Sequence, residues 1–267
     1  MAKRVDGKAA IVVGGGQTRG ETVGNGRATA IVLAREGARV IVADRHLESA
    51  RDTCEMIVGE GGQAWPFEAD ITNEPAARRL IAAGLERFGR LDILHNNVGA
   101  SLALGDASAT ELTEEAFQRS FDVNLKGMWL ACKHALPALR ETSGSIVNIS
   151  SMAARNAYPL VGYKTTKAAV VALTENLAAA NARYGVRANA ILPGLMNTPM
   201  AIEARVAQGT SREEVIAARD RRVPLRRRMG TGWDVAYAAL FLHSDEASFV
   251  TGVSLAVDGG EGVSWGS

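Results

Sequence analysis

The chain has 267 residues, of which 47% are hydrophobic and 22% charged, and its formal net charge at pH 7 is +1. This balance excludes a general attraction to nucleic acid or to a membrane surface, so we expect neither as a partner. The two cysteines, Cys54 and Cys132, stand far apart and outside any cysteine or histidine cluster. We therefore expect no disulfide scaffold and no metal site.

The amino terminus does not have the pattern of a secretory signal. Its first apolar run, residues 9–13, is shorter than the apolar core of a signal peptide, and no later run reaches the length of a membrane span. Two isolated cysteines suit a reducing compartment, so we expect a cytoplasmic location. The length fits one large α/β domain or two small ones.

Short apolar runs alternate with segments of helical periodicity. Strands are expected near residues 9–13, 39–43, 63–67, 91–97, 143–151, 187–192 and 253–260. Helices are expected at residues 26–36, 46–59, 74–89, 113–138 and 162–183. This alternation predicts a doubly wound, Rossmann-like parallel sheet of about seven strands with helices on both faces. No linker or repeat interrupts it, so we expect a single dinucleotide-binding and catalytic domain over residues 1–267.

A glycine-rich stretch, VVGGGQTRGETVGNGRATAI at residues 12–31, joins the first strand to the first helix. Gly14 and Gly16 follow the strand, and Gly24, Asn25 and Gly26 open the helix. Glycine lets the backbone approach a pyrophosphate, and a helix N-terminus offers free N–H groups and the positive end of a dipole. The spacing departs from G-x-G-x-x-G. Taken alone, the stretch is therefore either a dinucleotide site or a flexible turn.

Asp44 ends the second strand, close to the roughly 20-residue separation at which a carboxylate binds an adenosine ribose. A carboxylate there accepts hydrogen bonds from the ribose hydroxyls and repels a 2′-phosphate, which favours NAD over NADP. Arg45 and Arg19 favour the opposite choice, because either guanidinium could bind a 2′-phosphate. We expect NAD, with NADP as the open alternative.

The segment GYKTTKAAV places Tyr163 and Lys167 four residues apart at the start of a helix, and therefore on one face. A phenol with a pKa of about 10 is a poor base near neutral pH, and an ammonium beside it favours the phenolate. The pair suits general acid–base chemistry, although a surface pair has the same spacing.

From its first strand to its last residues the chain resembles the short-chain dehydrogenase/reductase family, in its compact single-domain branch. AAIVVGGG followed by GNG resembles the family's glycine loop. The other motifs follow in the family's order: ADI, NNVG, DVNLKG, NISS, YKTTK, PGLMNTPM and the terminal stretch from PLRRRMG to VDGG. The joint occurrence of these motifs carries the resemblance, since YxxxK by itself is common.

The resemblance implies four catalytic residues, Asn124, Ser151, Tyr163 and Lys167. Tyr163 would exchange a proton with the substrate oxygen while hydride moves to or from the nicotinamide. Lys167 would hold the nicotinamide ribose and lower the pKa of Tyr163. Ser151 would donate a hydrogen bond to the substrate oxygen, and Asn124 would hold a water linking Lys167 to solvent. A common family spacing, counted back from Tyr163, selects Ser150, which therefore remains the alternative serine.

The resemblance also implies a set of cofactor-binding residues. They are Gly14, Gly16, Gly24, Asn25, Gly26, Asp44, Asp70, Ile71, Asn97, Tyr163, Lys167, Pro193, Met196 and Thr198. Asp70 and Ile71 correspond to the turn over the adenine, and Met196 and Thr198 to the element that holds the nicotinamide amide. Residues 15–23 are longer than the family pattern. We interpret them as an excursion of a working cofactor loop, because loops tolerate insertions at little entropic cost.

These features predict an oxidoreductase that transfers a hydride between NAD and a secondary alcohol or ketone. An NADPH-dependent ketoreductase of the 3-oxoacyl type is the alternative. A non-catalytic dinucleotide sensor is a third possibility, against which the intact catalytic residues speak. A helical segment at about 199–225 is expected to cover the substrate cleft, and its arginines either attract an acidic substrate or form a solvated face. The substrate itself is not identified.

Two further expectations concern packing. The apolar carboxy-terminal segment and the helices at 113–138 and 162–183 resemble the elements with which family members form tetramers, so we expect a homotetramer. His95 falls in a central strand beside the cleft. The family uses no histidine there, and we expect a packed, neutral ring.

Overall fold

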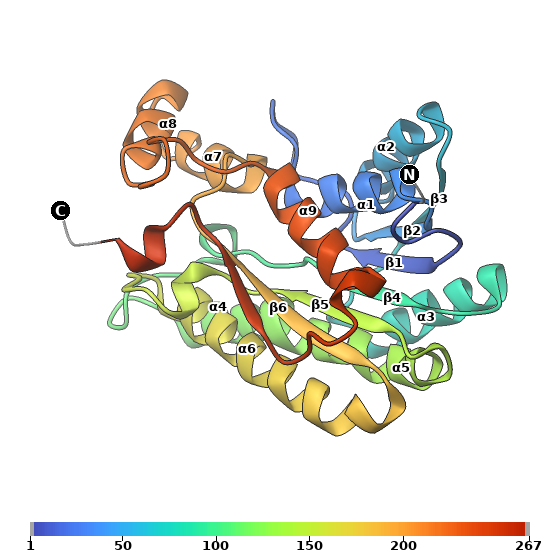
Figure 1. The fold of residues 1–267 in the computed structure, drawn as a ribbon. Helices are drawn as coiled ribbons and strands as arrows, with labels where there is room; N and C mark the ends of the chain where they lie inside the picture. The colour runs from blue at the N-terminus through green and yellow to red at the C-terminus, as the bar shows by residue number, and fades with distance from the viewer. Residues whose placement is uncertain (1–2, 265–267) are drawn as a thin grey trace.

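The order of the strands creates a crevice in the middle of the sheet. The computed structural model describes residues 3–264, and all seven of its strands lie in one parallel sheet ordered β3-β2-β1-β4-β5-β6-β7 (Figure 1). The strands are β1 (Ala9–Val13), β2 (Arg39–Asp44), β3 (Gln63–Glu68), β4 (Ile93–Asn96), β5 (Ser145–Ile149), β6 (Arg187–Pro193) and β7 (Ser254–Val257). The chain winds outward from β1 to β3 and then continues from β4 on the other side of β1. The predicted doubly wound sheet is confirmed, with its switch point between β1 and β4.

Helices cover both faces of this sheet (Figure 1). One face is covered by α1 (Asn25–Arg35), α2 (Leu47–Gly59) and α9 (Gly232–His243). The other is covered by α3 (Glu74–Phe88), α4 (Glu114–Phe121), α5 (Gly127–Thr142) and α6 (Val161–Asn181). The segment expected to cover the cleft forms α7 (Pro199–Val206) and α8 (Arg212–Asp220). Within residues 3–264, no helix is both long and apolar enough to cross a membrane.

Strand β1 shows why its sequence, AAIVV, is apolar throughout. Ile11 and Val13 point into the apolar cluster under α3 and α5, whereas Ala10 and Val12 point into the cluster under α1 and α9. All five residues of the strand are buried. A parallel strand covered on both faces loses the alternation of polar and apolar residues, and a continuous apolar run is its signature.

Two helical regions differ from the expectation. The expected helix at 113–138 consists of α4, a π-helical turn at Asp122–Lys126, and α5. A π-helical turn adds one residue without breaking the helix. The apolar periodicity changes little across it, so the pattern does not reveal the turn. The sequence indicated a helix around His243 but gave no bounds for α9, because its apolar residues lie all round the helix and blur the contrast between faces. It packs between α1 and strands β5 and β6, where most of its side chains are buried.

A pair of buried histidines joins β4 to the end of α9. The Nε2 atom of His243 lies 3.4 Å from Nδ1 of His95, and its Nδ1 atom lies 2.9 Å from the Ser145 hydroxyl. Both rings are fully buried. Burial lowers the pKa of His95 to about 3 and that of His243 well below its usual value of 6.5. His95 is therefore the packed, neutral ring that we expected.

This pair should make the fold sensitive to acid. Both folded-state pKa values lie below the unfolded value, so the unfolded chain binds more protons as the pH falls below about 6.5, down to about 3 for His95. Stability is therefore lost as the pH falls below about 6.5. We predict that the free energy of unfolding, measured with urea, falls less steeply between pH 6 and pH 4 in His95→Leu than in the unmodified chain. The exposed His46→Leu is the control, and equal slopes in both variants would contradict this prediction.

Candidate active site

Three elements meet at the switch point around the carbonyl of Gly14. A Cβ atom on Gly26, at the start of α1, would lie 2.0 Å from that oxygen, so only glycine fits there. The side-chain amide of Asn97, which follows β4, donates to the same oxygen at 3.1 Å. Gly14 itself has φ of 75°, a left-handed conformation that favours glycine. The predicted cofactor residues Gly14, Gly26 and Asn97 are thus brought together, with Asn97 supporting the loop.

The N-terminus of α1 opens into this crevice. Its N-cap is Gly24, which makes no side-chain capping bond, and the first turn contains no acidic residue. The buried Oδ1 atom of Asn25 has no hydrogen-bond partner among residues 3–264. Free N–H groups, the positive dipole end and an unpartnered acceptor fit a phosphorylated ligand that carries hydroxyl or amine donors. The residues present therefore fit a dinucleotide.

Asp44 lies at the carboxyl end of β2, next to the glycine loop. Its Oδ2 atom accepts from the N–H of Gly16 at 3.2 Å, and its Oδ1 atom accepts from the N–H of His46 at 3.0 Å. A carboxylate offers about four acceptor positions, so about two remain for ribose hydroxyls. Arg45 is exposed, and its Nε atom donates to the ring of His46 at 3.1 Å.

The excursion at residues 15–23 is held in place by side-chain hydrogen bonds, chiefly those of Gln17 and Ser49. The Oε1 atom of Gln17 accepts from the N–H of Gly24 at 2.9 Å, and its Nε2 atom donates to the carbonyl of Thr22 at 3.3 Å. The backbone of Gln17 exchanges two hydrogen bonds with the hydroxyl of Ser49 on α2. These bonds fold the excursion back on the start of α1 and leave the anchors Gly14 and Gly24 in place.

The tip of this excursion lies against α7. A Cβ atom on Gly20 would lie 2.9 Å from Cβ of Pro199 and 2.7 Å from a carboxylate oxygen of Glu203. Arg212, at the start of α8, pairs with Glu203 at 2.8 Å and lies 3.6 Å from the carboxylate of Glu21 in the excursion. The extended glycine loop therefore contacts α7 and the start of α8.

The turn after β3 contains Asp70 and Ile71. Asp70 is exposed, and its carboxylate accepts from the backbone and hydroxyl of Thr72 at 3.0 and 2.7 Å. Ile71 is buried, and its side chain fills the space beside Gly127 on α5. Ile71 thus packs in the core, whereas both hydrogen bonds to Asp70 end on Oδ1 and leave its Oδ2 atom open to a ligand.

The π-helical turn points Asn124 into the site. Asn124 is fully buried, and its amide exchanges two hydrogen bonds with the backbone of Ala100, at 2.8 and 2.9 Å. It also donates to the hydroxyl of Thr166 on α6 at 3.2 Å. Helical turns of this kind are frequent at functional sites. Asn124 therefore joins the loop after β4 to the catalytic helix.

Tyr163 and Lys167 lie on one face of α6, as predicted. The ammonium of Lys167 lies 5.6 Å from the centroid of the Tyr163 ring and donates to the carbonyl of Ile149 at 2.8 Å. A Cβ atom on Gly99 would lie 2.6 Å from this ammonium, which explains the glycine of the NNVG motif. Lys167 is almost completely buried, and burial lowers its pKa to about 8.

The two serines after β5 have different surroundings. The hydroxyl of Ser150 donates to the carbonyl of Lys167 at 2.7 Å and is turned into the core. The hydroxyl of Ser151 accepts from the N–H of Ala153 at 3.1 Å and lies close enough to Tyr163 to lower the pKa of its phenol. Of the two candidates, only Ser151 faces the site.

The expected downward shift of the Tyr163 pKa is not observed. Burial raises this pKa to about 12, and the hydroxyl of Ser151 and the charges of Arg205 and Arg219 oppose the shift only in part. The sequence places an ammonium near the phenol, but it does not show that desolvation of the phenolate outweighs nearby charges.

The loop after β6 brings the last predicted residues to the same edge of the sheet. Pro193 ends β6, and Met196 is buried and forms a single parallel bridge with Gly230. Thr198 is buried at the start of α7, where its hydroxyl makes no capping hydrogen bond. The hydroxyl thus remains available to a ligand.

Sequence reasoning missed two residues next to Tyr163. The buried Asp106 accepts from the backbone N–H groups of Gly162 and Tyr163, at 2.8 and 2.7 Å, and so caps the catalytic helix. The ring of Tyr158 lies 5.7 Å from that of Tyr163, centroid to centroid. Neither residue belongs to a motif, and Asp106 reaches the helix from a distant loop, so no local signal could have found them.

Comparison with known proteins agrees with this geometry. The family model described as enoyl-(acyl carrier protein) reductase matches residues 21–261. A solved structure from Burkholderia xenovorans, assigned to the short-chain dehydrogenases/reductases, superposes with a TM-score of 0.94 at 39% identity, covering 99% of this chain and 100% of that one. The chain belongs to the short-chain dehydrogenase/reductase family.

Enzymes of known reaction are among its relatives. The 2,5-dichloro-2,5-cyclohexadiene-1,4-diol dehydrogenase LinX of Sphingobium indicum is 36% identical, covering 97% of this chain and 98% of the relative. The 3-oxoacyl-(acyl-carrier-protein) reductase of Thermotoga maritima is 32% identical, covering 96% and 98%. The chain is thus an oxidoreductase that acts on CH–OH groups and uses a nicotinamide cofactor, NAD or NADP.

Proposed function

We propose that this oxidoreductase uses NAD to interconvert a secondary alcohol and a ketone, with Tyr163 as the acid–base. The observation that carries the proposal is the convergence of Ser151, Tyr163, Lys167 and Asn124 in one buried crevice, next to a helix N-terminus that suits a dinucleotide. No other part of the described chain brings such groups together beside the glycine loop.

Bound nicotinamide supplies the hydride acceptor or donor. Tyr163 holds the proton at the substrate oxygen, and its raised pKa keeps the hydroxyl protonated near neutral pH, as donation to a carbonyl requires. Ser151 orients the same oxygen through its hydroxyl. For oxidation Tyr163 must accept the proton, and the positive charges of Lys167, Arg205 and Arg219 then stabilise the phenolate. The carbonyl of Ile149 holds Lys167 in place, and Gly99 leaves room for its ammonium.

The acid–base role predicts a large loss of turnover when the hydroxyl oxygen of Tyr163 is removed. Tyr163→Phe should bind cofactor normally and lose at least roughly 10²–10⁴-fold in turnover, the usual contribution of general acid–base catalysis. Ser151→Ala should also lose activity, whereas Ser150→Ala, its matched control, should change turnover by less than about tenfold because its hydroxyl faces the core. Kinetics followed at the reduced nicotinamide absorbance provide the measurement. A Tyr163→Phe variant with half the original rate would remove Tyr163 from this role.

The choice of NAD rests on Asp44, whose carboxylate keeps acceptor positions free for ribose hydroxyls and repels a 2′-phosphate. The exposed Arg45 beside it supports the alternative, an NADPH-dependent ketoreductase of the 3-oxoacyl type. The Thermotoga relative of that name supports the same alternative.

Two neighbouring substitutions test the cofactor preference. Asp44→Ala should weaken NAD binding by roughly 10-fold or more and weaken NADP binding less, because both the hydrogen bonds and the repulsion are lost. Arg45→Ala is the matched variant and should leave NAD binding within about threefold. Dissociation constants from titration with each reduced cofactor provide the measurement. A wild-type chain that prefers NADPH would assign the choice to Arg45 or Arg19 instead.

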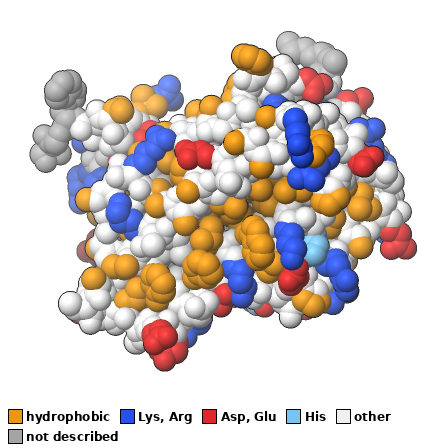
Figure 2. Space-filling view, turned by 90° about the horizontal axis from the view of Figure 1, so that it is seen from below, with side chains coloured by type: hydrophobic (Ala, Val, Ile, Leu, Met, Phe, Trp, Pro, Cys, Tyr) orange, Lys and Arg blue, Asp and Glu red, His pale blue; other side chains and the backbone are white. Residues whose placement is uncertain are grey.

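We also propose a homotetramer, supported by two exposed apolar areas. The first lies over α4 and α5, where Phe117, Phe121 and Trp129 are 39, 39 and 44% exposed. Figure 2 shows hydrophobic side chains gathered near the centre of this face, with Lys and Arg around them. The second includes Phe249, 102% exposed, and Val253 before the edge strand β7. Two separate areas suit a tetramer built from two kinds of two-fold contact.

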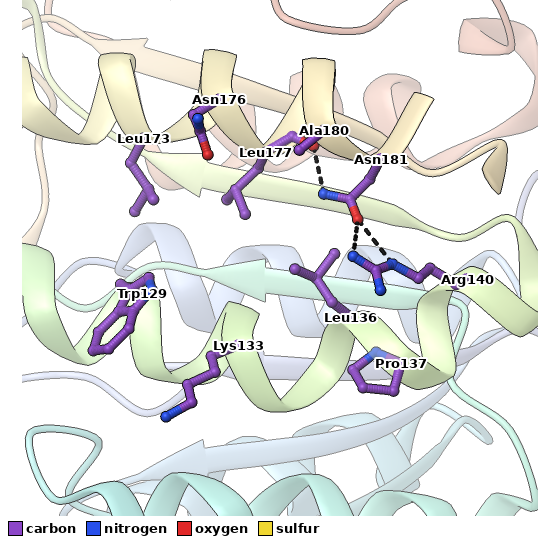
Figure 3. Close-up of a pocket in the computed structure, with 10 residues that line it drawn as sticks. All are labelled: Trp129, Lys133, Leu136, Pro137, Arg140, Leu173, Asn176, Leu177, Ala180 and Asn181. Carbon is purple, nitrogen blue, oxygen red and sulfur yellow. Dashed lines mark hydrogen bonds between the residues drawn. The ribbon is translucent and has the colours of Figure 1, made fainter. Parts of the chain in front are cut away.

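A groove between α5 and α6 adds to the first area. It has a volume of about 350 Å³, and Leu136 on α5 faces Leu173 and Leu177 on α6 (Figure 3). At one end the guanidinium of Arg140 donates twice to the side chain of Asn181, at 2.9 and 2.8 Å. Rigid, partly apolar walls of this kind suit the side chains of a second copy of the chain.

Light scattering tests the assembly. We predict a mass of about four times the 28.2 kDa chain, and a smaller assembly for Trp129→Arg, because the new charge would be buried in the contact. Val58→Arg, on the exposed side of α2, introduces the same charge at a residue 58% exposed and should keep the larger mass. A wild-type mass near one chain would exclude the tetramer.

A further inference from the structure

The helices that cover the cleft carry two arginines without a carboxylate partner. We call α7, α8 and the connecting residues 207–211 the lid. Arg212 of the lid pairs with Glu203 at 2.8 Å. Arg205 and Arg219, in contrast, make no ion pair within 4.0 Å among residues 3–264, although both are only partly exposed. These two guanidinium groups therefore lie within the fold with their charge uncompensated at close range.

Their hydrogen bonds use few of the available donors. Arg219 donates from Nη2 to the carbonyl of Met196 at 3.3 Å and from Nε to the sulfur of Met229 at 3.2 Å. Arg205 donates from Nη1 to the carbonyl of Ala201, within its own helix, at 2.6 Å. A guanidinium has five N–H donors, so most of those on both side chains remain free.

Arg219 lies at the edge of the sheet where Tyr163 is found, and the charges of both arginines influence Tyr163. The contact with Met196 places Arg219 on the loop between β6 and α7, at the carboxyl edge of the sheet. The charges of Arg205 and Arg219 both lower the pKa of Tyr163, against the larger effect of its burial. Tyr158, whose ring lies 5.7 Å from that of Tyr163, also interacts with the charge of Arg219. The two guanidinium groups thus act on the catalytic hydroxyl from the lid side.

A purely structural role explains this arrangement poorly. Burial and the neighbouring charges of Arg205 and Arg222 lower the pKa of Arg219 to about 10, so its charge is held at a cost. A neutral amide could donate to Met196 without that cost. Glu261, a carboxylate that acts on Arg219 at longer range, is already paired with Arg222 at 3.2 Å. Within the described part of the chain, the positive charges of Arg205 and Arg219 therefore remain without an ion-pair partner on the lid side of the cleft.

We propose that the substrate is a secondary alcohol or ketone that carries a carboxylate, which Arg219 and Arg205 bind on the lid side of Tyr163. The proposal rests on the proposed function and adds a substrate class to it. Guanidinium groups match the geometry of a carboxylate, and a bound anion neutralises two like charges at once. The carboxylate is unchanged in the reaction. On oxidation the alcohol carbon gives its hydride to the nicotinamide and its hydroxyl proton to Tyr163, leaving a ketone.

Kinetics on matched substrates test the proposal. The panel consists of 2-, 3- and 4-hydroxy acids with unbranched chains and the methyl ester of each, assayed with NAD and with NADP. The chain should prefer at least one acid to its ester by roughly 10–100-fold in kcat/KM, the contribution of a hydrogen bond to a charged group. In Arg219→Gln this preference should fall by at least roughly tenfold. Arg219→Lys keeps the positive charge but loses the planar pair of N–H donors, so it should restore part of the preference for acid over ester.

An exposed arginine of the same region provides the control. Arg228→Gln removes one positive charge from an exposed side chain and should leave the preference for acid over ester unchanged. Arg205→Gln should reduce the preference, as Arg219→Gln does. If Arg219→Gln lowers kcat/KM equally for acid and ester, the side chain only supports the lid and the proposal is overturned. The proposal is also overturned if the wild-type chain has the same kcat/KM for each acid as for its ester.

A binding measurement separates this proposal from the proposed function. Butanoate should raise the melting temperature of the wild-type chain, whereas butanamide at the same concentration, or sodium chloride at the same ionic strength, should not. The shift should disappear in Arg219→Gln and remain in Arg228→Gln. A chain stabilised by butanoate but inactive on every alcohol would contradict the proposed function alone. A chain that oxidises neutral alcohols and ignores butanoate would overturn the carboxylate site alone.

Discussion

The close approach of α1 to the end of β1 constrains the rest of the site. The carbonyl of Gly14 lies so near to Gly26 that no side chain fits between them, and Asn97 donates to the same oxygen. One oxygen atom thus fixes the relative positions of β1, β4 and α1. Strand β4 also leads into the loop whose Ala100 hydrogen-bonds to Asn124 and whose Gly99 lies against Lys167. The same contact therefore positions the proposed cofactor crevice and the proposed acid–base residues.

Features that depend on neighbours in sequence could be predicted. The apolar run of β1, the glycines that open α1 and the four-residue spacing of Tyr163 and Lys167 are local patterns, and each lies where it was expected. Features that depend on distant contacts could not be. Asp106 caps α6 from a loop far along the chain, and Gly20 lies against Pro199 of the lid. The choice between Ser150 and Ser151 likewise needed the direction of two side chains.

The electrostatics of the centre depend on burial more than on charge. Lys167 is close to the Tyr163 ring, yet burial raises the pKa of Tyr163 and lowers that of Lys167. Both shifts favour the neutral forms, as expected for groups removed from water. Sequence spacing shows only that the two groups are near each other. A charge-bearing ligand therefore has more influence on the protonation of this pair than it would at the surface, because so little water screens it.

The contact between the extended glycine loop and the lid has a thermodynamic consequence. Arg212 pairs with Glu203 of α7 and lies 3.6 Å from the carboxylate of Glu21, so a displacement of either segment changes an interaction of the other. If occupancy of the crevice shifts this loop, the free energy of that shift is shared with α7. Linkage then requires a ligand bound in the crevice and a ligand bound beside α7 to change each other's affinity by the same factor. An insertion in a turn thereby becomes a source of cooperativity within one chain.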